Sequence, residues 1–354
     1  MKIIFKHFIP YISVFFTACL LSYFFCSCKN DSELGNIEEL TNSSKELDKQ
    51  NDDKKASSIT FASWNVQTFF DAQTEGTEYD DFKKPGNWSR DKYTVRLQRL
   101  CEVMTSLNPD VFVLEEIENQ AVLQDISNFL EGKNWKNHKK WTYACFSKES
   151  GASIGCAVFS RHRIFDITCH SMDIRCQQTV QPSCRPIIEF SLEADGKQLT
   201  VLVNHWKSKL GTDESKIWRQ WQENLAASRA CRILPSPLIL CGDFNQDAKE
   251  FCCDFSRPSE GNVIFRGIEK KTLRVNCPWF TQNGSFSTTS GSYYYQGDWE
   301  RIDHIFSAGS ARLAAFSPKA EEPWADSEGR PVSYKLYNGE GYSDHLPVMC
   351  IVNF

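Results

Sequence analysis

The sequence predicts an α/β fold in which two stacked β-sheets carry helices on their outer faces. Three observations lead to this prediction. Short apolar segments of strand length recur from Ile59 to the C-terminus, amphipathic helical patterns lie between some of them, and the strands outnumber the helices. With 354 residues, of which 41% are hydrophobic and 24% charged, the chain is long enough for a large core in one or two domains.

The expected strands are either continuously apolar or alternate between apolar and polar residues. They are ITFASWNV (59–66), DVFVLEE (110–116), IGCAVFS (154–160), QLTVLVNHW (198–206), LILCGD (238–243), RIDHIFSA (301–308) and LPVMCIVNF (346–354). The expected helices are 93–107, 121–130 and about 213–233. In the third helix, Ile217, Trp221 and Leu225 recur at four-residue spacing and are expected to face the core.

The first 28 residues differ from the rest of the chain. Lys2 and Lys6 precede an uncharged segment from Phe8 to Ser27, which is typical of an export signal or a membrane anchor. Cys28 then opens a polar segment, and this arrangement resembles the cleavage and lipidation site of a bacterial lipoprotein. We therefore expect an exported protein of the cell-envelope membrane, lipid-anchored at Cys28 or held by a single N-terminal transmembrane anchor.

Residues 29–58 are expected to form a disordered acidic tether, because they contain no aromatic residue and carry eight acidic residues against five lysines. The predicted domains are thus a leader or anchor at 1–28, the tether at 29–58 and a catalytic domain at 59–354. The formal net charge of −5 argues against a protein that coats nucleic acid by overall attraction, so an anionic substrate has to be held by local cations.

Polar side chains recur at the ends of the predicted strands. They are Asn65, Glu115, Glu116, His205, Asp243, Asn245, Asp303, Asp344 and His345. If the strands lie side by side, these residues form one polar floor, an arrangement that is costly unless it binds something. Carboxylates such as Glu116 suit Mg²⁺, and an aspartate beside a histidine raises the pKa of the imidazole.

The ordered motifs resemble those of the endonuclease/exonuclease/phosphatase superfamily, which includes deoxyribonuclease I and the AP endonucleases. They are WNV at 64–66, the second glutamate of LEEIEN at 114–119, GDFN at 242–245, RIDHIF at 301–306 and YSDHLPV at 342–348. RPI at 185–187, NHWKSKLG at 204–211 and GSYYYQGDW at 291–299 resemble a bacterial branch of nucleases in that superfamily. The resemblance extends over residues 59–354 and implies a four-layered α/β sandwich with two mixed sheets packed face to face.

The resemblance also implies roles for individual residues. Glu116 is similar to the principal Mg²⁺ ligand, and Asp344 to a further carboxylate on the metal side. Asn65 is expected to orient Glu116 or the water on the metal. Asp243 is similar to the residue that aligns or deprotonates the attacking water. His205 and His345, the latter paired with Asp303, are expected to contact the scissile phosphate, and Asn245 and Arg185 to bind phosphate. Mg²⁺ is the expected cofactor, with Mn²⁺ or Ca²⁺ as alternatives.

Some residues depart from this pattern or are expected to lie elsewhere. Gln67 occupies a position where several AP endonucleases carry aspartate, and its amide is expected to coordinate the metal only weakly. Glu115 is expected to be a surface acid or one that supports the site from behind, and His304 to face away from it. We expect His162 and His170 to lie on the surface.

The implied function is that of a metal-dependent phosphodiesterase, most simply an exported, membrane-tethered nuclease that hydrolyses DNA or RNA by in-line attack of a water molecule. A serine or cysteine nucleophile on a nucleophile elbow is not expected. Two alternatives stay open, a sphingomyelinase-like phospholipid phosphodiesterase and a non-catalytic binding protein that retains the fold. The aromatic residues Tyr293, Tyr294, Tyr295 and Trp299 fit contact with lipid, stacking on bases or simple packing, and Lys207 and Lys209 are candidate phosphate contacts.

Overall fold

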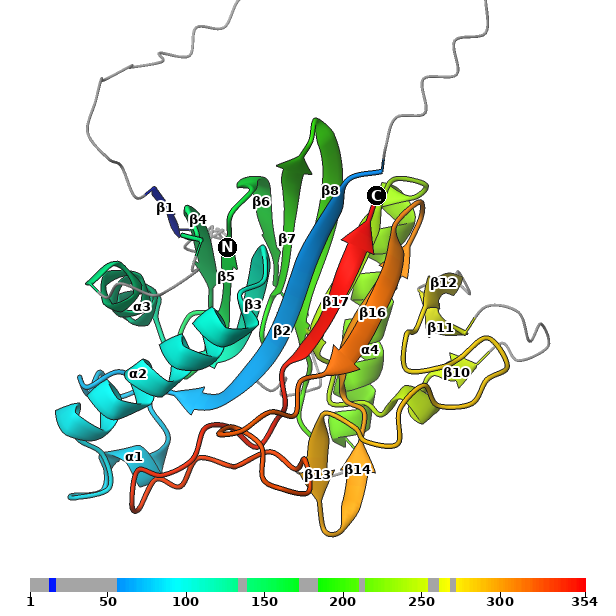
Figure 1. The fold of residues 1–354 in the computed structure, drawn as a ribbon. Coiled ribbons are helices and arrows are strands. Elements are labelled where there is room, and N and C mark those ends of the chain that lie inside the picture. Colours follow the sequence, from blue (N-terminus) through cyan, green and yellow to red (C-terminus); the bar gives the residue numbers. More distant parts are fainter. Residues whose placement is uncertain are drawn as a thin grey trace, which may run out of the picture.

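The computed structural model describes residues 13–16, 56–132, 139–171, 184–209, 214–253, 261–267 and 272–354. Two large β-sheets pack face to face, with α2 and α3 outside one sheet and α4 against the other (Figure 1). The expectation of a four-layered α/β sandwich is confirmed.

The first sheet has seven strands in the order β1-β4-β5-β3-β2-β17-β16. Their bounds are β1 Ser13–Phe16, β2 Ser58–Phe69, β3 Val111–Ile117, β4 Tyr143–Ser147, β5 Gly155–Ser160, β16 Arg312–Pro318 and β17 Val348–Asn353. Neighbours pair antiparallel except β2 and β3, which run parallel. The sheet is therefore mixed, as expected.

The second sheet has eight strands in the order β10-β11-β12-β15-β9-β8-β7-β6. Their bounds are β6 Arg163–His170, β7 Ile187–Ala194, β8 Lys197–His205, β9 Leu238–Asp243, β10 Cys252–Cys253, β11 Asn262–Arg266, β12 Thr272–Asn276 and β15 Asp303–Ala308. Here β8 and β9 form the parallel pair. A separate hairpin of β13 (Tyr293–Tyr295) and β14 (Asp298–Glu300) lies below the sandwich in Figure 1.

The three helices predicted from the sequence are present as α2 Arg90–Leu107, α3 Gln120–Gly132 and α4 Glu214–Ile233. The short helix α1 Asp80–Lys83 and the 3₁₀ turn η1 Ala248–Glu250 were not predicted. The Ser89 side chain accepts a hydrogen bond from the Lys92 amide at the start of α2, and Asn108 ends this helix in a left-handed conformation before Pro109.

The predicted inner face of α4 was wrong at Ile217, whereas Trp221 and Leu225 are partly buried against core residues, as predicted. Ile217 is 47% exposed, whereas Trp218 and Gln222 are buried. The polar Gln222 faces inward because its Oε1 accepts a hydrogen bond from the Lys207 amide at 2.8 Å, an interaction that apolar spacing does not reveal.

The buried side chains form two large clusters, because most strands are buried on both faces. Between the sheets, Phe61 and Val113 of the first sheet lie in one cluster with Cys241 and Ile305 of the second, and this cluster extends to α4 on the other side of the second sheet. On the other side of the first sheet, side chains such as Trp64, Phe112 and Leu114 pack beneath α2 and α3, with Leu97, Leu100, Met104 and Ile126. Successive strand residues point to opposite faces, so Phe61 and Trp64 enter different layers.

Little of the predicted leader and tether is described. Ser13–Phe16 form β1, whose backbone pairs with β4, and Cys28 lies outside the described residues. None of the helices in the described part of the chain is both long and apolar enough to cross a membrane. The leader, the lipid anchor and the tether therefore stay predictions.

Candidate active site

The predicted polar residues gather at one edge of the two sheets, the lower edge in Figure 1, where β2 ends and β17 begins. In the second sheet, strand register places His205 opposite Asp243 and Asp243 opposite Asp303. Ligand atoms of Asp243, Asp303 and His345 lie within 4.8 Å of one another. Residues far apart in the sequence thus form one buried polar cluster.

The close approach of β8 and β9 explains the glycine that precedes Asp243. Gly242 has φ +123°, and a Cβ atom there would lie 1.9 Å from the Asn204 carbonyl oxygen. Only glycine tolerates that approach. Phe244 is fully buried in the core, and Asn245 adopts a left-handed conformation with φ 47°. The Gly-Asp-Phe-Asn segment therefore turns the chain at the strand end while Phe244 anchors it.

Asp243 accepts hydrogen bonds from two asparagines. Its Oδ2 accepts from Asn65 Nδ2 at 3.0 Å and from Asn245 Nδ2 at 3.1 Å, and its Oδ1 accepts from the Asn245 amide at 2.8 Å. Burial and the nearby charge of Asp303 raise the pKa of Asp243 to about 7. A carboxylate with this pKa is suited to accept a proton near neutral pH.

Asn245 is fixed in the same network. Its Nδ2 also donates to the Trp206 carbonyl oxygen at 3.1 Å, so the amide of Asn245 orients Asp243. The expected contact between Asn245 and phosphate stays a prediction.

Glu116 lies at the more open side of the cluster, with its side chain 16% exposed. Its Oε1 accepts from Asn65 Nδ2 at 3.1 Å, and its Oε2 accepts from the Thr68 amide at 2.6 Å. The Gln67 amide donates to Asn65 Oδ1 at 2.9 Å, which turns Asn65 Nδ2 toward the two carboxylates. Asn65 thus orients Glu116 and Asp243.

The turn that holds Glu116 depends on a buried arginine. Gln67 and Thr68 both have positive φ, at 56° and 50°. Arg96 of α2 donates to the carbonyl oxygens of Val66 at 2.9 Å and Thr68 at 3.0 Å and to that of Gln67. Its guanidinium is buried against the rings of Phe69 and Tyr334, and burial lowers the pKa of Arg96 to about 10, which leaves it charged at neutral pH.

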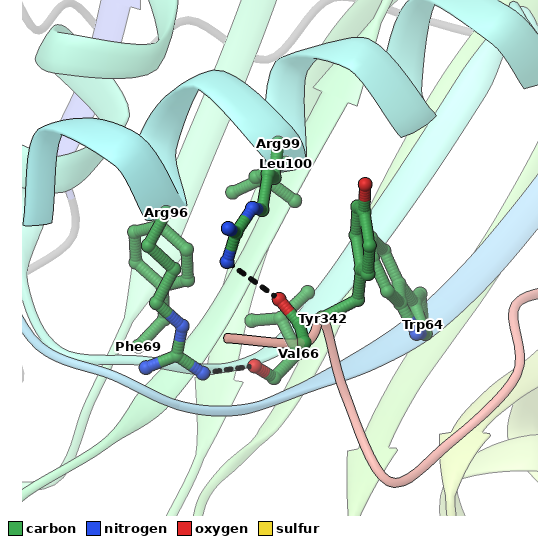
Figure 2. Close-up of a pocket in the computed structure, with 8 residues that line it drawn as sticks. Trp64, Val66, Phe69, Arg96, Arg99, Leu100 and Tyr342 are labelled. Carbon is green, nitrogen blue, oxygen red and sulfur yellow. Dashed lines mark hydrogen bonds between the residues drawn. The ribbon is translucent and has the colours of Figure 1, made fainter. Parts of the chain in front are cut away.

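Figure 2 shows the small pocket between α2 and this turn, with Arg96 pointing at the Val66 carbonyl. Arg99, one helical turn further on, donates to the Gly341 carbonyl at 3.2 Å, close to the segment that carries Asp344 and His345. The contacts of Arg96 with the turn were not predicted from the sequence. The signal was present, since Arg96 occupies the same helix face as Tyr93, Leu97 and Leu100, where a charged residue requires a partner.

The two site histidines are shifted in opposite directions. Burial lowers the pKa of His345, but the charge of Asp303 and the 2.8 Å contact between His345 Nδ1 and Asp303 Oδ2 outweigh it, so the pKa lies well above its usual value. Burial holds the pKa of His205 well below its usual value, and the charges of Arg185, His345 and Lys207 lower it further. One imidazole is therefore a cation and the other is neutral.

His345 and Asp303 are also held through their backbones. Trp64 Nε1 donates to the His345 carbonyl at 2.9 Å, and Trp279 Nε1 donates to the Asp303 carbonyl at 3.0 Å. The Ser343 hydroxyl accepts from the His345 amide at 3.1 Å. These contacts fix the ion pair with little freedom to reorient.

Glu116 and Asp344 fit a divalent cation better than the other acids do. Asp344 Oδ1 lies 3.9 Å from His345 Nε2, its side chain is 32% exposed, and burial together with the charge of Glu116 raises the pKa of Asp344. A hard cation with oxygen ligands, such as Mg²⁺, would relieve this repulsion. Asp303, in contrast, already pairs with His345.

The positive side of the site is formed by Arg185 and Lys207. Arg185 directly precedes β7 and is partly exposed, and its charge lowers the pKa of His205 and of Lys207. Lys209 does not belong to this group, contrary to expectation. Its Nζ lies 2.6 Å from Glu250 Oε1 and 3.0 Å from Glu300 Oε2, so its charge is already paired.

Three expectations about neighbouring residues need correction. Gln67 does not point at a metal, because its side chain makes two hydrogen bonds with the backbone of Tyr334, at 2.7 and 3.3 Å. Of the two positions expected for Glu115, the surface is wrong and the one behind the site is correct. Glu115 is fully buried, its Oε1 accepts from Ser63 Oγ at 2.7 Å, and burial raises its pKa well above the usual value. His170 is not a free surface histidine, because its Nε2 lies 2.7 Å from Glu189 Oε2.

His304 faces away from the site, as expected. It is buried beside Phe244 and Phe306, and its Nε2 contacts the Gln246 carbonyl at 2.9 Å.

The string GASIG at 151–155 has the G-x-S-x-G spacing of a nucleophile elbow, although no such elbow was expected from the sequence. A nucleophile elbow joins a strand to a following helix. Here the string precedes β5, so Ser153 does not lie on an elbow.

Curated relatives match only part of the chain. Carbon catabolite repressor protein 4 homolog 3 of Arabidopsis thaliana is 20% identical over 247 residues, 67% of this chain and 53% of that protein. Nocturnin of Xenopus laevis is 26% identical over 196 residues, 53% of this chain and 47% of that protein. The chain spans about half the length of these two relatives.

Solved structures share the fold at low sequence identity. TDP2 from C. elegans has a TM-score of 0.52 at 14% identity and covers 84% of this chain and 75% of its own. D. rerio TDP2 complexed with a single-strand DNA product and a mannosyl-6-phosphatase from Bacteroides thetaiotaomicron both give a TM-score of 0.51 at 16% identity. Each covers 84% of this chain and 100% of its own.

The family model described as the Endonuclease/Exonuclease/phosphatase family matches residues 62–345, a span that contains every site residue from Asn65 to His345. The chain therefore belongs to the Endonuclease/Exonuclease/phosphatase family.

Proposed function

We propose that the protein is a metal-dependent phosphodiesterase that hydrolyses nucleic acid. The observation that carries this proposal is the close approach of a buried carboxylate with a raised pKa to a buried histidine–aspartate ion pair. Asp243, with a pKa of about 7, lies within 4.8 Å of the charged His345–Asp303 pair. A proton acceptor beside a fixed cation is what hydrolysis of a phosphate ester by water requires.

Each residue of the site has a separate role in the proposed reaction. Asp243, oriented by Asn65 and Asn245, takes the proton from the attacking water, whose oxygen forms the new bond to phosphorus. The His345 imidazolium donates to a non-bridging phosphate oxygen and stabilises the charge that develops there. Neutral His205 donates a hydrogen bond to the same phosphate, and Arg185 neutralises its charge. A divalent cation held by Glu116 and Asp344 would polarise the phosphate and stabilise the leaving oxygen.

Nucleic acid is favoured over other phosphate esters by the aromatic rings of Tyr293 and Tyr295, which lie beside His345. Among proteins of the same fold, D. rerio TDP2 was crystallised with a single-strand DNA product. The Bacteroides thetaiotaomicron protein of that fold is a mannosyl-6-phosphatase, so the fold alone does not select a substrate.

The test is to incubate the full chain in detergent with plasmid DNA, single-stranded RNA, sphingomyelin and a hexose phosphate, each with Mg²⁺ and with EDTA. We expect cleavage of DNA or RNA in Mg²⁺ only, and its loss in Asp243→Ala. Preferred hydrolysis of sphingomyelin or of the hexose phosphate would overturn the nuclease assignment. Binding of DNA without cleavage would leave a binding protein that retains the fold.

We also propose that the protein is exported and lipid-anchored at Cys28. The argument rests on the uncharged segment from Phe8 to Ser27, on Cys28 directly after it and on the polar tether that follows. Cys28→Ala should leave the activity per molecule unchanged and move the protein out of the detergent phase in a Triton X-114 partition. The mass of the N-terminal peptide decides the case, because an intact Met1 would indicate a transmembrane anchor instead.

A further inference from the structure

The hairpin β13–β14 lies directly beside the catalytic cluster. The backbone of Tyr293 forms a β-bridge with His345, and the two rings lie 4.8 Å apart between centroids. The hydroxyl of Ser292 accepts from the Asp303 amide at 3.2 Å, and the Ser292 carbonyl accepts from the Leu346 amide at 2.7 Å. The start of the hairpin is therefore attached to the His345–Asp303 pair.

The two faces of the hairpin have different surroundings. On one face Tyr294 packs against Trp299 with centroids 5.0 Å apart, and the Arg330 guanidinium lies 5.5 Å from the Tyr294 ring. On the other face Tyr293 and Tyr295 are nearly parallel, with centroids 6.2 Å apart and an interplanar angle of 19°. Tyr295 is 52% exposed. This face presents flat aromatic surface to solvent next to the phosphate site.

The hairpin is held at its base. Lys209 joins Glu300 of β14 to Glu250 of η1, and the Ser292 amide donates to the Glu300 carbonyl at 3.0 Å. Gly291 allows this approach, because a Cβ atom there would lie 2.1 Å from the Glu300 carbonyl oxygen. A surface fixed before binding loses less entropy when a ligand stacks on it.

We propose that Tyr293 and Tyr295 form a stacking platform for the nucleobase next to the scissile phosphate, an inference that rests on the proposed function. The exposed ring of Tyr295, held nearly parallel to the ring of Tyr293, offers a flat face on which a base can stack, and every base has such a face. Tyr293 contacts His345, so a base joined to the bound phosphate through one sugar reaches the platform. A lipid surface would need a broader apolar patch than the single exposed ring of Tyr295 offers.

The test compares two single strands of equal length, one with bases and one in which tetrahydrofuran replaces every nucleoside. Both have the same phosphates, so their ratio of kcat/KM isolates the contribution of the bases. Tyr295→Ala in the full chain should lower this ratio about tenfold, mainly through KM, since stacking on one aromatic side chain contributes on that order. Tyr295→Phe keeps the ring and should retain the ratio.

Tyr337→Ala is the matched control, because Tyr337 is 72% exposed and its carbonyl is held by Lys92 of α2, away from the hairpin. It should behave as wild type on both strands. A second measurement follows the binding of a phosphorothioate strand in EDTA by fluorescence anisotropy, where Tyr295→Ala should weaken binding about tenfold.

The outcomes separate the two proposals. If wild type cleaves neither strand under any metal condition, the nuclease assignment fails and the platform fails with it. If wild type cleaves the base-bearing strand and Tyr295→Ala leaves the ratio unchanged, the platform alone is overturned. An equal loss on both strands would likewise overturn it, because that would indicate damage to the phosphate site.

Discussion

Each sheet contributes one half of the site, and the residues of the two halves are positioned in different ways. In the second sheet, ordinary register places His205, Asp243 and Asp303 opposite one another on neighbouring strands. In the first sheet, Glu116 has φ 67°, and the register shifts just after Asn65 and after Glu115. The half proposed to face the phosphate is thus set by strand pairing, and the half proposed to hold the cation departs from it.

The backbone conformation around Glu116 has to be stabilised by contacts from elsewhere in the protein. Left-handed conformations of residues other than glycine cost about 1–2 kcal/mol each, and Gln67, Thr68 and Glu116 all adopt one. Arg96 offsets part of this cost by binding three carbonyls of the turn from behind. One half of the site therefore depends on a residue of α2 that does not contact the other half.

The largest effect on activity is expected from a substitution of Glu116, in the half of the site that is proposed to hold the cation. Glu116→Gln should lower kcat/KM at limiting Mg²⁺ by about 100-fold or more, because loss of a mere supporting partner of a metal ligand already costs about 10- to 100-fold. Excess Mg²⁺ should restore part of the activity. The measurement is kcat/KM as a function of Mg²⁺ concentration.

Glu115→Gln is the matched control, with the same substitution one residue away. Burial raises the pKa of Glu115 well above its usual value, so its carboxyl is already uncharged and the change should have little effect. A Glu116→Gln enzyme with the metal dependence of wild type would contradict the assignment of the cation half.

The second-largest effect on activity is expected from a substitution of Asp303, in the half of the site that is proposed to face the phosphate. Asp303 raises the pKa of His345, so Asp303→Asn should lower that pKa and remove the imidazolium at a lower pH. The alkaline limb of the pH–rate profile should move to lower pH, and the rate at a fixed alkaline pH should fall about tenfold if the pKa of His345 falls by about one. The acid limb, assigned to Asp243, should move to lower pH as well, because the charge of Asp303 raises the pKa of Asp243. An unchanged alkaline limb would show that the pair does not titrate with activity.

A smaller effect is expected from the support of the turn. Arg96→Lys keeps the charge but replaces the planar guanidinium, whose fixed donors match the three carbonyls and which packs on the Phe69 and Tyr334 rings, so we expect kcat to fall about three- to tenfold and the free energy of unfolding to fall by about 1–3 kcal/mol. The Mg²⁺ concentration that gives half-maximal activity should rise, and the alkaline limb of the pH–rate profile should change little. Arg90→Lys, exposed at the start of the same helix, is the control. If Arg96→Lys shifted the alkaline limb instead, the two halves would not be independent.

The smallest effect is expected from Arg185 at the rim. Arg185→Met should raise KM several-fold and reduce the slope of log KM against log salt by about 0.7–0.9, the value expected for one lost phosphate contact. The exposed Arg232 at the end of α4 provides the control Arg232→Met, which should leave the slope unchanged. An unchanged slope in Arg185→Met would remove Arg185 from the phosphate site.

Local sequence patterns were enough to predict the strands β2, β3, β5, β8, β9, β15 and β17, the helices α2, α3 and α4, and the ordered motifs that contain Asn65, Glu116, Asp243, Asp303 and His345. The other described strands and α1 were not predicted. The predicted elements were readable because apolar periodicity and glycine-containing turns are local properties, as at Gly242 before Asp243. The prediction failed where a residue's role depends on a distant partner, as for Gln67 on Tyr334 and Lys209 on Glu250 and Glu300.

The sequence predicted the pairing of His345 with Asp303, but the tertiary structure was needed to see the opposite pKa shifts of the two histidines and the carbonyl contacts of Arg96. His205 and His345 are chemically identical in the sequence, and both are buried. They differ because Asp303 lies 2.8 Å from His345, whereas the cation of Arg185 acts on His205. Electrostatic interactions depend on distance and burial, which strand register and sheet packing set and which the order of residues along the chain does not specify.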